Sequence, residues 1–146
     1  MTQERDRRSD SDFSWLINDF VSRVHGVTQA LIMSSDGLSL TASDGMSTVE
    51  GEQLAAIASG MLSLARNSAA LFDKGTCENI IVRLSRGYFL FMGIDAGAGL
   101  AVLTGPDCDM KVVAYEMTQF VVRAGHALTP ERRADLRRVL VGRRPE

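Results

Sequence analysis

The sequence predicts an α+β protein in which helices pack on a five-stranded antiparallel sheet in a two-layer arrangement. Three observations lead to this prediction. Apolar residues recur at helical spacing in three long segments, and apolar runs of strand length lie between them. The connections within each group of strands are too short for the crossover that parallel strands require. The expected order is helix, two strands, helix, three strands and helix, with no internal repeat or linker.

The first helix is expected to begin at residue 13 and to end before Gly26, with Ser11 or Asp12 as its N-cap. Its apolar face consists of Phe13, Leu16, Ile17, Phe20, Val21 and Val24. Residues 1–12 mix arginines with acidic residues and show no apolar periodicity. We therefore expect residues 1–12 to be a disordered leader that folding does not need.

Two strands should follow, at Val27–Ser34 and Leu38–Ser43. The Asp36-Gly37 pair between them supplies the positive φ angles of a tight hairpin. In the second strand apolar residues alternate with serine and threonine. This alternation predicts one buried face and one face in water.

The central helix is expected to start at a capping box formed by Ser47 and Glu50 and to run to about Asp73. Gly75 should supply the left-handed residue that ends it. On a helical projection the bulky apolar residues share one arc, which we expect to lie on the sheet. They are Leu54, Ile57, Ala58, Met61, Leu64, Ala65, Ala69, Leu71 and Phe72.

The opposite arc of this helix should be charged if it faced water, yet Arg66 is the only charged residue between Glu52 and Asp73. A helix without a charged face is usually buried on both sides. Another part of the same domain could cover it, or a second copy of the chain could. We favour the second copy, because little of the chain is left over and symmetry hides such a surface. The predicted contact residues are Ala56, Ser59, Gly60, Ser63 and Asn67.

Three more strands are expected at Thr76–Leu84, Tyr88–Ile94 and Leu100–Thr104, followed by a helix that starts near Met110. The main domain is therefore expected to span residues 13–128. Residues 129–146 should form a short terminal helix, begun by Thr129-Pro130, and a basic tail. Six arginines against three acidic residues give this segment a charge of +3, and because the whole chain carries −2, the rest carries −5.

Composition excludes several classes of function. A mildly acidic body is unsuited to nucleic acid, whose phosphates need a cationic face. No apolar run is long enough to span a membrane and no signal peptide is recognisable, so we expect a cytoplasmic protein with reduced cysteines. His25 and His126 lie at helix ends, away from other ligand-type residues, which predicts no metal site. The sequence contains no phosphate-binding loop or nucleophile elbow, so we expect neither an enzyme nor a cofactor.

The chain resembles the roadblock/dynein light chain family over about residues 13–125. The residues that carry the resemblance are Gly26, Val27, Ala30, Ser34, Asp36, Gly37 and Leu38, followed by Leu54, Ala55 and Ala56 in the long helix. The resemblance implies a fold of the roadblock, longin and profilin type. It also implies a homodimer in which the long helices pack together and the strand at Thr76–Leu84 pairs with its copy edge to edge. Interface residues on that strand would be Cys77, Asn79, Ile81 and Arg83.

The resemblance also implies a function, since bacterial members of the family regulate small Ras-like GTPases. Many of these are encoded beside a sensor kinase in G+C-rich bacteria, and only two of the sixteen basic residues here are lysines, which fits such a genome. We therefore expect a non-enzymatic dimeric adaptor of a Ras-like GTPase, with a sensor kinase as a further partner and with membrane contact only through a partner. The alternative is a small-molecule sensor of the PAS or profilin-like type. Such a sensor should enclose a pocket with convergent polar groups, whereas the expected interior is apolar.

Overall fold

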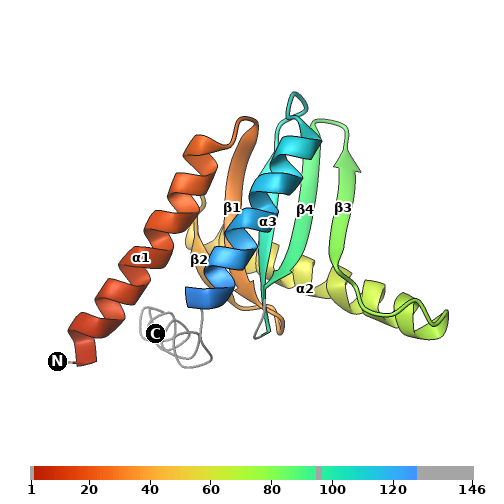
Figure 1. The fold of residues 1–146 in the computed structure, drawn as a ribbon, viewed down its shortest axis with the longest axis horizontal. Helices are drawn as coiled ribbons and strands as arrows, with labels where there is room; N and C mark the ends of the chain where they lie inside the picture. Colours follow the sequence, from red (N-terminus) through yellow and green to blue (C-terminus); the bar gives the residue numbers. More distant parts are fainter. Residues whose placement is uncertain (1, 95–96, 128–146) are drawn as a thin grey trace.

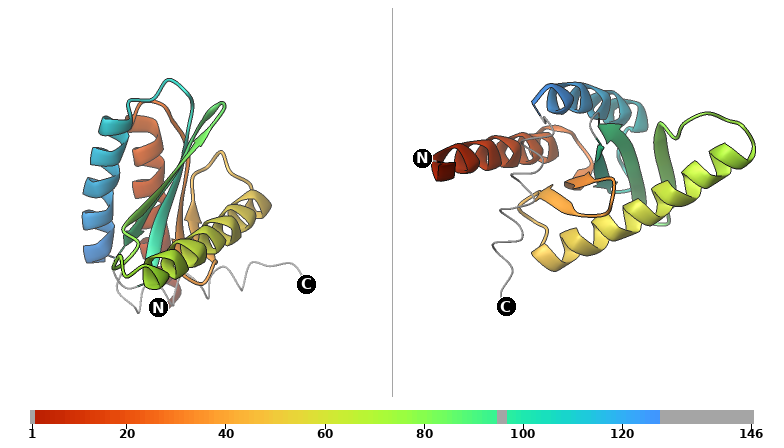
Figure 2. Two further views of the ribbon diagram at one scale, coloured as in Figure 1. Left: turned by 90° about the vertical axis from the view of Figure 1, so that its right-hand side faces the viewer. Right: turned by 90° about the horizontal axis from the view of Figure 1, so that it is seen from below.

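The computed structural model describes the backbone of residues 2–94 and 97–127, and the side chains within those ranges from residue 13 onward. In chain order the elements are α1 (Thr2–Arg23), β1 (Val27–Ser34), β2 (Ser39–Ala42), α2 (Thr48–Leu71), β3 (Asn79–Leu84), β4 (Gly87–Ile94), β5 (Ala98–Thr104) and α3 (Met110–Ala127). The strands form one antiparallel sheet in the order β2-β1-β5-β4-β3. Helices α1 and α3 cover one face of this sheet, and α2 crosses the other (Figures 1 and 2).

The predicted fold class is confirmed, with a correction to the layering. Buried side chains form two separate clusters, one between the sheet and α1 with α3, and one between the sheet and α2. The molecule therefore has three layers where two were expected. The physical reason lies in β1 and β5, whose continuous buried runs give each strand two apolar faces that both need cover.

The start of α1 also differs from the prediction. The helix begins at Thr2, so residues 2–12 continue it and neither Ser11 nor Asp12 caps it. This segment contains neither glycine nor proline, the residues that would end a helix. That folding can proceed without the leader remains a prediction. The expected terminal helix and basic tail at residues 129–146 lie outside the described residues.

The first core cluster fixes α1 and α3 against the sheet and against each other. Phe20 of α1 and Phe120 of α3 meet edge to face, with ring centroids 5.3 Å apart. Above them an Arg23 nitrogen lies 2.7 Å from a Glu116 carboxylate oxygen. That hydrogen bond raises the pKa of Arg23, against a smaller opposing effect of burial. The two helices thus lie side by side on the same face of the sheet.

The second core cluster is built differently. Helix α2 contributes Ala55, Ala58 and Leu62, which pack with large side chains of the strands such as Phe89 and Phe91. Small residues at i and i+3 let the helix axis approach the sheet closely. On this side most of the buried side-chain volume therefore comes from the strands and little of it comes from α2.

Both ends of α2 have well-defined caps. The predicted capping box is confirmed, since Ser47 Oγ accepts from the Glu50 N–H and the Glu50 carboxylate accepts from the Ser47 N–H. At the other end the predicted role of Gly75 is wrong. Asp73 is the residue with left-handed φ, at 52°, and Lys74 N–H donates to the Ala69 carbonyl at 2.8 Å. This bonding closes a Schellman motif two residues before Gly75, because aspartate tolerates the left-handed region; Gly75 also has a positive φ, 83°, but it lies beyond the motif.

Candidate interaction surface

The most unusual surface of this protein is the side of α2 that faces away from the sheet. Ile57, Leu64 and Leu71 repeat every seven residues there and are 57%, 71% and 76% exposed. Gly60 and Asn67 lie between them, so the spacing alternates between three and four residues. We call these five residues the outer stripe. Its spacing is that of the a and d positions of a coiled-coil seam, in which one helix packs against another.

Gly60 is the most informative residue of the outer stripe. A glycine inside a helix costs about 1 kcal/mol relative to alanine. Among the described residues, nothing lies within 4 Å of where a Cβ at position 60 would be. No contact with the described residues therefore requires a glycine, whereas a second helix packed closely against this point would.

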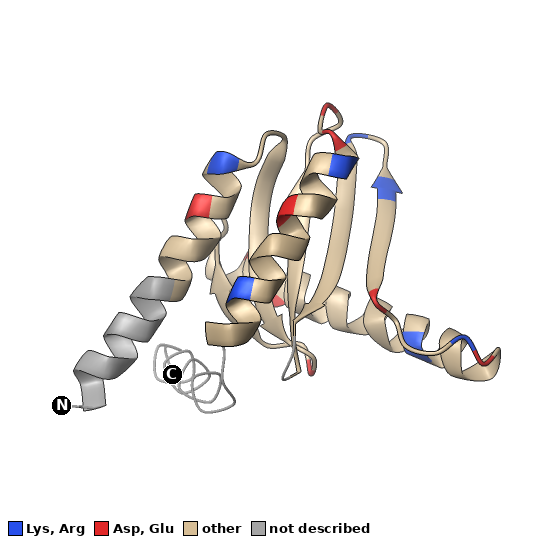
Figure 3. Ribbon diagram, viewed as in Figure 1, with Lys and Arg blue, Asp and Glu red and all other residues tan. Residues whose placement is uncertain are grey.

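Electrostatics agree with a contact surface on α2. Between Glu52 and its end at Leu71 the helix carries a single charge, Arg66, while α1 and α3 display both signs (Figure 3). The capping hydrogen bonds from Ser47 lower the pKa of Glu50 and keep that carboxylate ionised at the N-terminus. Over most of its length the outer side of α2 therefore carries few charged groups that water could solvate.

By length and composition α2 could also cross a membrane, and it is the one helix in the described part of the chain that could. Its inner side argues for another interpretation. Gly51, Ala55, Ala58 and Leu62 are buried, and Ala55, Ala58 and Leu62 pack against the sheet. A helix held to a sheet along one side and apolar along the other is typical of a protein contact.

The sequence prediction placed α2 about a quarter turn away from its observed orientation. Ile57, Leu64, Leu71 and Phe72 were expected on the sheet and are exposed. Ala55 and Leu62, which the helical projection leaves outside the arc expected on the sheet, are buried. The bulky residues were assigned to the core because they are the most apolar, but close packing on the sheet selects the small ones. The three-and-four spacing of the outer stripe was the signal that could have identified it.

The predicted contact residues on α2 divide into two groups. Ala56, Gly60, Ser63 and Asn67 are exposed, either on the outer stripe or beside it. Ser59 is half-buried, and its hydroxyl donates to the Ser35 carbonyl at 3.2 Å. Ser59 thus faces the β1–β2 turn of its own chain and helps to hold that turn against α2.

The second predicted contact region is the strand β3, which forms one edge of the sheet. Within the described residues it pairs with β4 alone, so its outer backbone groups are open. Asn79, Ile81 and Arg83 share one face and are exposed, with Ile81 at 58%. Cys77 precedes the strand, which begins at Asn79 and not at Thr76 as expected, and it is half-buried against the cluster under α2.

Side chains on β3 and the outer stripe do not form one continuous patch. Ile80 and Val82 pack into the cluster on the α2 side, so Ile81 and Arg83 point to the other face of the sheet. The backbone edge of β3 lies between the two sets. A strand that pairs with this edge would therefore place its own side chains on both faces, beside Ile81 and Arg83 on one and beside Ile80 and Val82 on the other.

The described residues contain no group of histidine, cysteine and acidic side chains that could hold a metal ion. A family model described as Roadblock/LC7 domain matches residues 13–104. No curated protein matches the sequence.

Several solved structures resemble this one. A Roadblock/LC7 domain from Streptomyces avermitilis is 33% identical, with a TM-score of 0.72 over 76% of this chain and 92% of that one. MglB from Myxococcus xanthus is 9% identical, with a TM-score of 0.72 over 79% and 93%. Profilin IB from Acanthamoeba castellanii is 16% identical, with a TM-score of 0.54 over 77% and 96%. The last two show a shared fold.

Proposed function

The chain belongs to the Roadblock/LC7 domain family, and on this premise we propose that it is a non-enzymatic homodimeric adaptor that regulates a small Ras-like GTPase. The observation that carries the proposal is the outer stripe of α2. Its three large apolar side chains are more than half exposed, although the helix holds one charge along most of its length. An exposed apolar surface of this kind is typical of a site that another protein covers.

A second copy of the chain is the partner that we propose for the outer stripe. A two-fold axis would place each stripe against itself, with Gly60 allowing close approach and Asn67 setting the register. The same axis would pair the open edges of β3 and join the two sheets. Pairing also removes an exposed strand edge, which otherwise invites aggregation. Ala56, Ser63, Asn79, Ile81 and Arg83 would then lie at or near the interface.

Two observations support the GTPase part of the proposal, the membership in the Roadblock/LC7 family and the sequence motifs of the chain. The sequence contains no phosphate-binding loop, so nucleotide would be bound by the partner and not by this protein. The adaptor would act in the cytoplasm, beside a sensor kinase. Its arginine-bearing segment at residues 129–146 would attract an acidic partner and speed the encounter.

Two measurements test this proposal. Light scattering coupled to gel filtration should give the mass of a dimer at micromolar concentration, and a monomer would contradict the first half. Calorimetry should detect binding to the GTPase encoded nearest to this gene, tested in its GDP and GTP-analogue states. We expect about micromolar affinity, a binding free energy near −8 kcal/mol. If neither state binds at tens of micromolar while a metabolite stabilises the protein against heat, the sensor alternative replaces the second half.

A further inference from the structure

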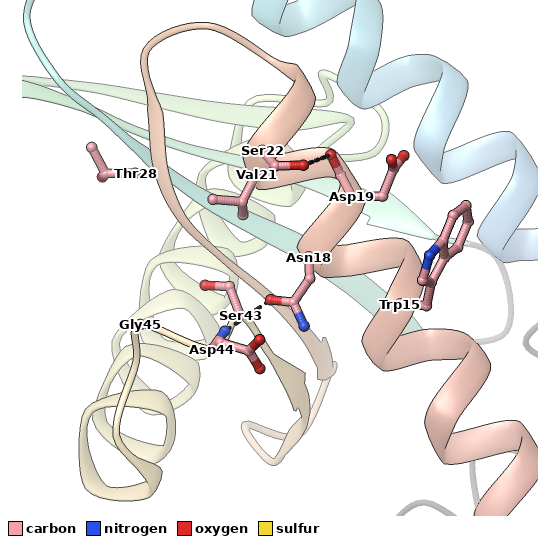
Figure 4. Close-up of a pocket in the computed structure, with 9 residues that line it drawn as sticks. All are labelled: Trp15, Asn18, Asp19, Val21, Ser22, Thr28, Ser43, Asp44 and Gly45. Atoms are coloured by element: carbon pink, nitrogen blue, oxygen red, sulfur yellow. Dashed lines mark hydrogen bonds between the residues drawn. The ribbon is translucent and has the colours of Figure 1, made fainter.

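A groove lies along the outer side of α1, on the far side of the sheet from the outer stripe. It has a volume of about 480 Å³ and is bounded by α1 and by the loop between β2 and α2 (Figure 4). Trp15, Asn18 and Asp19 line it from α1, and Asp44 and Gly45 line it from the loop. The Asp44 N–H donates to Asn18 Oδ1 at 2.9 Å, which fixes the loop against the helix.

The chemistry of the groove suits a cationic, partly apolar ligand. Trp15 is the only tryptophan of the chain and is 65% exposed, so its indole face is available for stacking. Arg23 lies 3.4 Å from one oxygen of Asp19, and Asp44 makes no side-chain ion pair with any described residue. An arginine guanidinium binds a carboxylate and stacks on an indole at the same time.

The chain itself contains such a ligand. Residues 129–146 carry +3, while the rest of the chain carries −5. In the helical form expected after Thr129-Pro130, Arg133 and Arg137 would be one turn apart, beside Leu136 and Leu140. One short segment thus combines two guanidinium groups with an apolar face.

The position of α3 makes the contact reachable within one chain. Helix α3 runs antiparallel to α1 and ends at Ala127, toward the end of the molecule where α1 begins (Figures 1 and 2). Residues 128–146 follow. Even as a continuous helix they would span about 28 Å.

We propose that the arginine-bearing segment after Thr129 docks in the groove of its own chain, with Arg133 and Arg137 on Asp19, Asp44 and the indole of Trp15. The docked segment is then a built-in peptide ligand of the domain. An acidic partner that attracts the segment competes with the groove for the same arginines. The inference depends on neither the dimer nor the GTPase, so its failure leaves the proposed function standing.

Trp15 reports the contact directly, because its fluorescence is the only tryptophan signal of the full chain. In the double variant Arg133→Glu/Arg137→Glu, quenching by acrylamide should rise about two-fold, because the indole loses its guanidinium cover. Arg143→Glu/Arg144→Glu is the matched control, with the same change of charge outside that face, and should leave quenching unchanged. High salt should raise quenching in the original chain and not in the first variant.

A charge exchange separates docking from a general effect of charge. Asp44→Arg alone should expose Trp15, and Asp44→Arg combined with Arg133→Glu/Arg137→Glu should restore its protection. Equal quenching in the original chain and in Arg133→Glu/Arg137→Glu would overturn the proposal. Protection that disappears on dilution by about a hundred-fold would overturn it too, because the segment would then come from a second copy.

Discussion

The two helical layers of this protein handle their apolar residues in opposite ways. On one face, α1 and α3 turn large apolar side chains toward the sheet, so that Ile17, Phe20 and Met117 are almost fully covered. On the other face, α2 buries alanines and one leucine and leaves Ile57, Leu64 and Leu71 in water. The first layer is complete within one chain. The second has a core side and an outer side with large exposed apolar residues, and this outer side is the basis of the proposed contact with a second copy.

The largest effect that this comparison predicts is a loss of folding stability in the first layer. Phe20→Ala removes a fully buried ring that meets Phe120. The free energy of unfolding should fall by about 3–5 kcal/mol, from lost burial and the cavity left behind. Urea unfolding measures it. Val122→Ala, at an exposed position on α3, is the control and should change stability by less than about 0.5 kcal/mol. A similar loss of stability in both variants would show that Phe20 contributes no more to the fold than an exposed residue does.

The second prediction concerns association and not folding. Leu64→Glu or Gly60→Arg places a charge in the outer stripe, which should weaken the dimer at least about a hundred-fold, because the charge would lie unpaired in the seam. Arg66→Glu, on the same helix but off the stripe, should leave the dimer intact. Light scattering over a dilution series reports the mass of each variant. A dimer that survives both stripe substitutions would assign the contact to another surface.

The third prediction concerns Gly60→Ala. This substitution should raise the stability of the protomer and lower the affinity of the dimer, which separates folding from association. The added methyl group meets none of the residues that the structure describes, so the protomer should gain about 1 kcal/mol from helix propensity. The dimer should weaken, because the two backbones can no longer approach as closely. Urea unfolding at a protein concentration below the dimer dissociation constant measures the stability of the protomer. Light scattering over a dilution series measures the affinity of the dimer. Stabilisation of both states would show that Gly60 does not face another helix.

The smallest effect is expected at the start of α2. Hydrogen bonds from Ser47 lower the pKa of Glu50 in the folded protein, so ionised Glu50 stabilises the fold above its unfolded pKa. That stabilisation is lost as the pH falls through the lowered pKa. Glu50→Gln should therefore melt slightly below the original chain near pH 7, and the difference should vanish once the pH is below the lowered pKa of Glu50. A difference that persists in acid would show that charge is not its cause.

The sequence by itself determined the kinds of elements, their order and most of their ends. Its helical spacing, the turn between β1 and β2 and the Ser47–Glu50 capping box are local signals that depend on local hydrogen bonding, although in the turn only Gly37 has the positive φ that was expected of the Asp36-Gly37 pair. The same signals also indicated that α2 is too apolar to stand alone in water. These features depend on residues a few positions apart, which is why they can be predicted from one sequence.

Only the tertiary structure decided which side of each element meets which neighbour. The rotation of α2 was set by the fit of Ala55 and Ala58 against the aromatic side chains of β4, and this fit outweighed the greater hydrophobicity of Ile57 and Leu64. The groove beside Trp15 likewise joins α1 to a loop more than twenty residues away. Close packing acts between surfaces that are distant in sequence, and its energy depends on shape as well as on apolar content. A helical projection contains the apolar content and not the shape of the sheet.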